Sequence, residues 1–283
     1  MELFQLPPEV LSSLYHYEIG RYSDGAAAAF FIYDYLLTLN LEVQLIWESP
    51  WSIPKALFLL NRYLPFLEFI LNYFRDNVGG MAPYCYFLLH VITWLYIAGI
   101  FLSEIILTLR VLAIWRMKTP LIIGSIILNI VDFAIIGTVA ELTIHPLRFF
   151  DLPPFTGCLT MPSNSLLFIG FIVATVYDVI RAVNQVMLVF MIIPFMSIKR
   201  KYAKRHKSQC FEVMYTEGVL FYVYLLALST ITFLLMYYFR DNLFTFVYVA
   251  RILRAVLASR MVLHLRYLYR KGSHMELTSV YAL

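Results

Sequence analysis

Charged and amide side chains interrupt two long apolar runs that lie on either side of a short polar link. The stretch Tyr33–Phe66 holds most of both runs, and its link, Glu48–Lys55, contains two prolines and a tryptophan. Each run is long enough to cross a bilayer, so the unit is typical of a membrane hairpin. Ionisable groups at membrane depth are costly and normally face a bundle interior or a partner. The polar residues concerned are Asp34, Asn40 and Glu42 in the first run and Asn61, Arg62 and Glu68 in the second.

Glu42 and Arg62 lie at a common depth. With a rise of about 1.5 Å per helical residue, Glu42 is roughly 7 Å, and Arg62 roughly 9 Å, from the inner end of its run. The two helices would be adjacent and antiparallel, so opposite charges meet. We expect a buried Glu42–Arg62 ion pair with a structural rather than a functional role, because a lone charge there would be very costly.

A second set of ionisable residues falls near mid-membrane. Asp178 and Arg181 are three residues apart and can meet on one helix face. Arg251 and Arg254 share a face of the last run, and we expect Asp34 and Glu68 to neutralise them. The set indicates either a midplane pocket for an ion or polar ligand, or, as we favour, interhelical ion pairs that specify packing. Its members are Asp34, Glu68, Glu104, Asp132, Asp178, Arg181, Arg251 and Arg254.

Motifs of known enzymes are missing from the sequence. His90 and His264 are the histidines within apolar runs, and they lie near opposite membrane faces. There is no His-Glu-x-x-His, Gly-rich phosphate loop or Gly-x-Ser-x-Gly motif. The last run has no lysine to which retinal could attach. We therefore expect no catalytic, metal or cofactor site and no cofactor.

The composition predicts an all-α polytopic membrane protein. Of its 283 residues, 61% are hydrophobic and 14% are charged, against about a quarter charged in soluble domains. We expect a short acidic outer tail over 1–25, a membrane domain over 26–264 and a cytoplasmic tail over 265–283. The seven predicted spans are about 26–47, 56–74, 84–114, 120–141, 165–197, 213–239 and 242–264.

The distribution of lysine and arginine between the loops predicts the orientation. Twelve basic residues fall on one side of the seven spans and four on the other. This asymmetry places the N-terminus outside and the C-terminus inside, in the plasma membrane or the secretory pathway. The basic segment 199–207 would then face the cytoplasm, where it could bind anionic lipid or a cytoplasmic protein, although its role in topology already accounts for it.

Two of the three cysteines fall on the outer side. Cys85 begins the third span, and Cys158 lies in the longest outer loop. Outer cysteines meet an oxidising compartment, so we expect a Cys85–Cys158 disulfide, two unpaired thiols being the alternative. Cys210 lies in the basic inner loop, where a free thiol is favoured over a palmitoylated one.

The motif YDYLLTLNLEVQLIW, followed by W-S-x-x-K-x-L-F-L-x-N-R-Y, resembles the N-terminal signature of a fungal, chiefly basidiomycete, family of uncharacterised multi-pass proteins with a domain of unknown function. Further matches are SEIILTLRVLAIW, the Glu217–Gly218 step and SRMVLHLR at 259–266. The resemblance covers most of the chain. It implies a fungal membrane protein with seven helices and no assigned activity.

Two classes of function remain open. Seven helices, an outer N-terminus, an outer disulfide and a basic third inner loop resemble the layout of G-protein-coupled receptors. The chain departs from them: LRVLAIW replaces Asp/Glu-Arg-Tyr, the last span lacks Asn-Pro-x-x-Tyr, and the sixth span lacks proline. A transporter or channel would use the midplane charges, but we find no internal repeat. A non-catalytic structural or lipid-interacting role is a further alternative. We favour a receptor-like sensor.

The predicted topology can be tested with terminal reporters. A reporter fused after Leu283 should be cytoplasmic and one placed before Met1 should be outside, as measured by protease protection in intact cells. Both termini on one side would contradict the seven-span interpretation.

Overall fold

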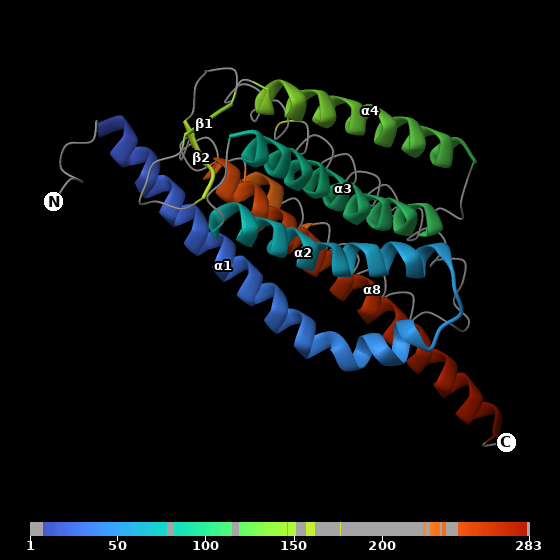
Figure 1. Ribbon diagram of the computed structural model, residues 1–283. Coiled ribbons are helices and arrows are strands. Elements are labelled where there is room, and N and C mark those ends of the chain that lie inside the picture. Colours follow the sequence, from blue (N-terminus) through green and yellow to red (C-terminus); the bar gives the residue numbers. More distant parts are fainter. Residues whose placement is uncertain are drawn as a thin grey trace.

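Long helices account for most of the protein that the structure describes (Figure 1). The computed structural model describes residues 8–77, 82–114, 119–145, 147–150, 157–161, 176, 223–224, 227–232, 234–235 and 243–281. The elements are α1 (Pro8–Glu42), the π-helical η2 (Val43–Trp47), α2 (Ile53–Asn77), α3 (Ala82–Ile114), α4 (Thr119–Ile144), β1 (Arg148–Phe150), β2 (Leu159–Met161) and α8 (Leu243–Tyr281).

Helix α8 contacts α1, α2 and α3, and helix α3 also contacts α2 and α4. Figure 1 shows α4 at one edge of the bundle, packed on α3, whereas α8 crosses behind α2. The first turn of α1 and the last turn of α8 lie at opposite ends of the bundle. The main apolar core forms where α1, α3 and α8 meet, and it includes Phe31, Ile92, Tyr96, Tyr248 and Ile252.

Among the residues that the structure describes, three helices are long and apolar enough to cross a membrane: Tyr17–Trp47, Pro83–Arg110 and Ile122–Leu142. Helix α4 exposes isoleucines 123, 126, 127 and 130, as expected of a surface that faces lipid. Helices α2 and α8 are also long, but they carry buried charges that lower their mean hydropathy. These features fit an integral membrane protein. The predicted spans 165–197 and 213–239 lie mostly outside the described residues.

Helix α1 starts much earlier than the expected acidic tail over 1–25 allows. It is helical from Pro8, because its polar residues have partners that the sequence did not reveal. Asp24 binds Arg75 of α2 at 3.3 Å, and the hydroxyl of Tyr17 donates to Asp76 at 3.3 Å. Tyr17 and Asp24 therefore pack against α2 instead of belonging to a loose tail.

Helix α8 likewise continues beyond residue 264, where we expected the tail over 265–283 to begin. Arg266 explains part of this extension, because its guanidinium donates to the Leu45 carbonyl at 2.9 Å and to the Ser49 hydroxyl at 3.0 Å. Arg270 donates to the Gln44 carbonyl at 3.1 Å. The extension is thus attached to η2 and to the turn that follows it.

The turn between η2 and α2, residues 48–52, is held by a buried lysine. Lys55 donates to the carbonyls of Trp47 at 3.0 Å and Ser49 at 2.7 Å. Carbonyls at a helix C-terminus lack partners within the helix, and a lysine nearby also suits the helix dipole. Lys55 therefore closes the hairpin that the sequence predicted. We call this end of the bundle the turn end.

The opposite end, which we call the disulfide end, carries the antiparallel pair β1–β2. Cys85 of α3 and Cys158 form a disulfide with their Cα atoms 5.5 Å apart, and the Cys158 amide donates to the Arg75 carbonyl at 3.1 Å. Gly157 has φ of 113° and lies against Tyr17 and Asp76, so a side chain there would be strained and would clash. The strands are therefore tied to α1, α2 and α3.

Loss of the disulfide should loosen this end. Replacing Cys85 and Cys158 together with serine should lower the free energy of unfolding by about 2–4 kcal/mol, because the unfolded chain is no longer crosslinked. Thermal unfolding in detergent measures the loss, and non-reducing mass spectrometry should find the two wild-type peptides linked. Cys210→Ser is the matched control and should change neither result. Alkylation of both Cys85 and Cys158 in unreduced protein would refute the pairing.

Candidate functional site

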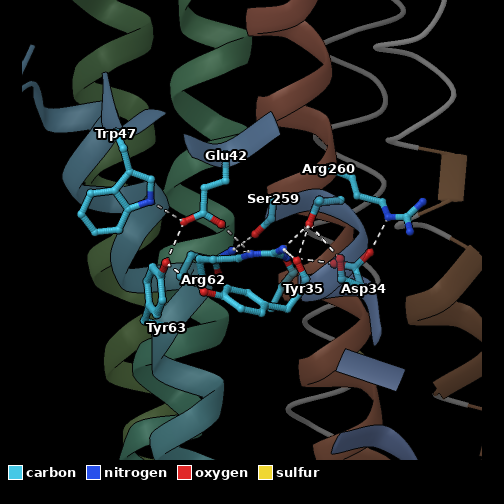
Figure 2. A network of polar contacts seen from close by, with 11 residues as sticks. Asp34, Tyr35, Glu42, Trp47, Arg62, Tyr63, Ser259 and Arg260 are labelled. Carbon is cyan, nitrogen blue, oxygen red and sulfur yellow. Dashed lines mark hydrogen bonds and ion pairs between the residues drawn. The ribbon is translucent and has the colours of Figure 1, made fainter. Parts of the chain in front are cut away.

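Arg62 of α2 is the centre of a buried polar cluster (Figure 2). Its guanidinium binds Asp34 of α1 at 2.9 Å through Nη1 and Glu42 at 3.3 Å through Nε. Nη2 donates to the Thr38 hydroxyl and, at 3.5 Å, to the Tyr35 carbonyl. The structure thus brings together Glu42 and Arg62, the pair expected from their common depth, and adds Asp34 to them.

Glu42 is held by two aromatic residues as well as by Arg62. One carboxylate oxygen accepts from the Tyr63 hydroxyl at 2.8 Å and from the Trp47 indole at 3.1 Å. Trp47 is the last residue of the π-helical segment and follows Glu42 by five positions. Because a π-helix pairs residues i and i+5, the Trp47 side chain comes to lie over Glu42. Figure 2 shows Trp47 and Tyr63 converging on the carboxylate.

Asp34 also binds Arg260 of α8, through Nε and the carboxylate oxygen that Arg62 does not use. The side chain of Arg260 is 48% exposed, so it closes the cluster at the bundle surface. Two guanidinium groups and two carboxylates then balance, and we call Asp34, Glu42, Arg62 and Arg260 the Arg62 cluster. It joins α1, α2 and α8 without a net charge.

Arg251 and Arg254 of α8 form pairs that are separate from the Arg62 cluster. Arg251 Nε binds Glu68 of α2 at 3.2 Å, and both side chains are buried. Arg254 lies 4.0 Å from Glu104 of α3 and donates to the Ser229 hydroxyl at 3.2 Å. The expectation that Asp34 would neutralise this face of α8 is therefore wrong. Asp34 lies at the level of Arg260, about 9 Å further along α8 than Arg254.

A neutral set of hydrogen bonds lies beside the Arg62 cluster. Asn61 donates to the Ala255 carbonyl at 3.2 Å and to the Ser259 hydroxyl at 3.3 Å. Its own carbonyl oxygen accepts from the Ser103 hydroxyl at 2.7 Å. One amide thus connects α2, α3 and α8. The sequence showed Asn61 as a polar residue in a span, but nothing in it identified the small serines as partners.

The disulfide end has a further ionic group that sequence reasoning missed. Arg75 Nε binds Asp76 at 2.9 Å, and Nη2 binds Asp24 at 3.3 Å. Burial would lower the pKa of Arg75, but the neighbouring carboxylates, above all Asp76, raise it above its usual range. Arg75 therefore stays charged and ties the middle of α1 to the end of α2.

Three other residues were predicted at the midplane. Asp132 is buried on α4, whereas Asp178 and Arg181 lie outside the described residues. Within the described ranges, no group of three His, Cys, Asp or Glu side chains could hold a metal ion. The buried atoms of Asp34, Glu42 and Arg62 all have partners. The Arg62 cluster is therefore suited to fixing helices in register.

Residues 22–67 match the model of a family of unknown function (DUF6533). This segment covers most of α1, all of η2 and the first part of α2, and it contains every member of the Arg62 cluster except Arg260. No curated protein and no solved structure matches the chain. The part of the chain that the family model describes thus carries the buried charges Asp34, Glu42 and Arg62 of the hairpin, but not Glu68.

Removing the central guanidinium should be severely destabilising. Arg62→Met leaves the carboxylates of Asp34 and Glu42 buried with too few cations, and breaking a buried pair in this way costs about 3–5 kcal/mol. The measurement is equilibrium unfolding in mixed detergent micelles. Arg21→Met is the control, because the Arg21–Glu18 pair is partly exposed and such pairs contribute about 0–1 kcal/mol. Equal stability of the two variants would show that the cluster does not hold the bundle together.

Proposed function

We propose that this protein is a receptor-like sensor with seven membrane helices, an outer N-terminus and an inner C-terminus. Its apolar helices and its match to a family of unknown function support the broader statement, an integral membrane protein of unknown function. The receptor-like role is a more specific statement, and it rests on the pairing of buried charges between helices.

The observation that carries the proposal is the pairing of α8 with its neighbours. Arg251, Arg254 and Arg260 contact acids of α2, α3 and α1 respectively. A transporter or channel uses ionisable groups along a hydrated route, and they exchange partners as the route opens. Charges engaged with one another across four helices favour a bundle that responds by small shifts of packed helices.

The two ends of the bundle are suited to a signal that passes from the outer side to the cytoplasm. The disulfide end is fixed to α1, α2 and α3 by a covalent bond and by hydrogen bonds. In the proposed topology this end faces outward, and the basic segment 199–207 faces the cytoplasm, where it would attract an acidic protein or anionic lipid. A shift of α8 would be transmitted along its extension past the turn end.

Cys210 offers a native position for a reporter of this response. Because Cys85 and Cys158 are disulfide-bonded, Cys210 is the one cysteine of the sequence outside that bond. Purified protein is labelled at Cys210 with an environment-sensitive dye and reconstituted into vesicles, and small polar solutes are added from outside. A receptor-like sensor should show a saturable emission change for a ligand, without movement of that solute into the vesicle.

Flux measurements separate the sensor from a transporter. Vesicles with and without protein are compared for uptake of the same solute and of Na⁺, K⁺, Cl⁻ and H⁺. Cys210→Ser, which removes the dye but no buried charge, controls for labelling. Protein-dependent flux that Glu68→Gln abolishes would overturn the receptor-like role and favour transport.

A further inference from the structure

Five buried polar atoms between α2, α3 and α8 have no hydrogen-bond partner among the described residues. They are Nη1 and Nη2 of Arg251, Oε2 of Glu68, Oδ1 of Asn72 and the hydroxyl of Tyr248. All four side chains are at least 98% buried. Buried polar groups in folded proteins are almost always satisfied, and an ordered water or a bound molecule is one explanation for a group without a protein partner.

These atoms belong to one place in the bundle. Glu68 and Asn72 are four residues apart on α2, and Tyr248 and Arg251 are three apart on α8, so each pair shares a helix face. Arg251 joins the two faces through Glu68 at 3.2 Å. Tyr96 of α3 completes the group, since its hydroxyl bonds Asn72 and its ring stacks on Tyr248 at 5.5 Å.

Gly99 of α3 fixes the position of the Arg251 guanidinium. A methyl group at Gly99 would overlap Nε, Cζ and Nη2 of Arg251, so the guanidinium lies directly against the α3 backbone. Glu68 accepts from Nε. The two terminal nitrogens therefore have hydrogen-bonding capacity that neither Glu68 nor Gly99 uses.

The charges and the free atoms define what could bind. Arg251 and Glu68 neutralise each other, so neither a cation nor an anion is favoured by net charge. The occupant must accept hydrogen bonds from Arg251 and donate them to Glu68 and Asn72. Water does both, and so does a small neutral molecule with a hydroxyl or amide group.

We propose that Glu68, Asn72, Arg251 and Tyr248 form a buried binding site for a net-neutral hydrogen-bonding molecule, either water or a small neutral solute. The site is independent of the receptor-like role, since a sensor or a transporter could contain it. It differs from the Arg62 cluster, whose buried atoms the protein itself satisfies.

The first test is the sign of the stability change in Tyr248→Phe. A dry, unpaired hydroxyl destabilises the folded protein, so its removal would raise the Tm. A hydroxyl bonded to an occupant contributes to stability, so its removal should lower the Tm in detergent by a few degrees. Tyr96→Phe is the control and should lower the Tm in either case, because that hydroxyl bonds Asn72. A higher Tm for Tyr248→Phe would overturn the proposal.

The second test detects the occupant directly by radiolytic hydroxyl labelling of wild-type protein, in which trapped water oxidises adjacent side chains. Tyr248 and Tyr96 should be modified several-fold more than Phe31, which is buried in the same apolar core. Acetamide is the neutral probe, and it should reduce this labelling in a saturable way if the site binds small solutes. Labelling that acetamide leaves unchanged would show that the site holds water. Labelling of both tyrosines no stronger than that of Phe31 would refute an occupied site.

Discussion

The whole described bundle depends on the burial of the Arg62 guanidinium. A charge that is removed from water needs opposite charges and hydrogen bonds at the same depth, or it is very costly. Arg62 obtains them from Asp34, Thr38 and Glu42, which occupy successive turns of α1. Because carboxylates at two levels of α1 bind one side chain of α2, the two helices cannot slide past each other without breaking a pair. Asp34 extends the same constraint to α8 through Arg260.

Helix α8 forms an ion pair with each of α1, α2 and α3. Its arginines reach three different helices because helical residues are spaced about 100° apart around the axis. Arg251 and Arg260 are nine positions apart, so they project from nearly opposite sides of α8, toward Glu68 of α2 and Asp34 of α1. Arg254 projects about 60° from Arg251, toward Glu104 of α3. Each pair therefore specifies a different neighbour, and the set favours one rotation of α8 in the bundle.

Contacts within the hairpin could be predicted from the sequence, and most of those between distant segments could not. Glu42 and Arg62 are separated by one short link, so counting residues from the link gave their common depth. The partner of Arg254 depended on the rotation of α8 and on which helices surround it, neither of which residue spacing determines. Asp24 looked like part of a tail because its partner, Arg75, is 51 residues away. The pairing of Cys85 with Cys158 could be predicted, since the expected membrane topology placed both cysteines on one side of the membrane.

Arg62 and Arg251 are both fully buried. They differ in how many of their guanidinium nitrogens have hydrogen-bond partners, and this difference separates their roles. Arg62 uses every nitrogen of its guanidinium against α1, whereas Arg251 uses only Nε, against Glu68. Full satisfaction at Arg62 gives a fixed set of contacts near the turn end. Two nitrogens of Arg251 without hydrogen-bond partners would lower the free energy of unfolding, which is small in most proteins. A second molecule bound to these nitrogens would remove this cost. The Arg62 cluster, together with the disulfide end, supplies the rigidity that allows the region between them to keep polar atoms free for an occupant.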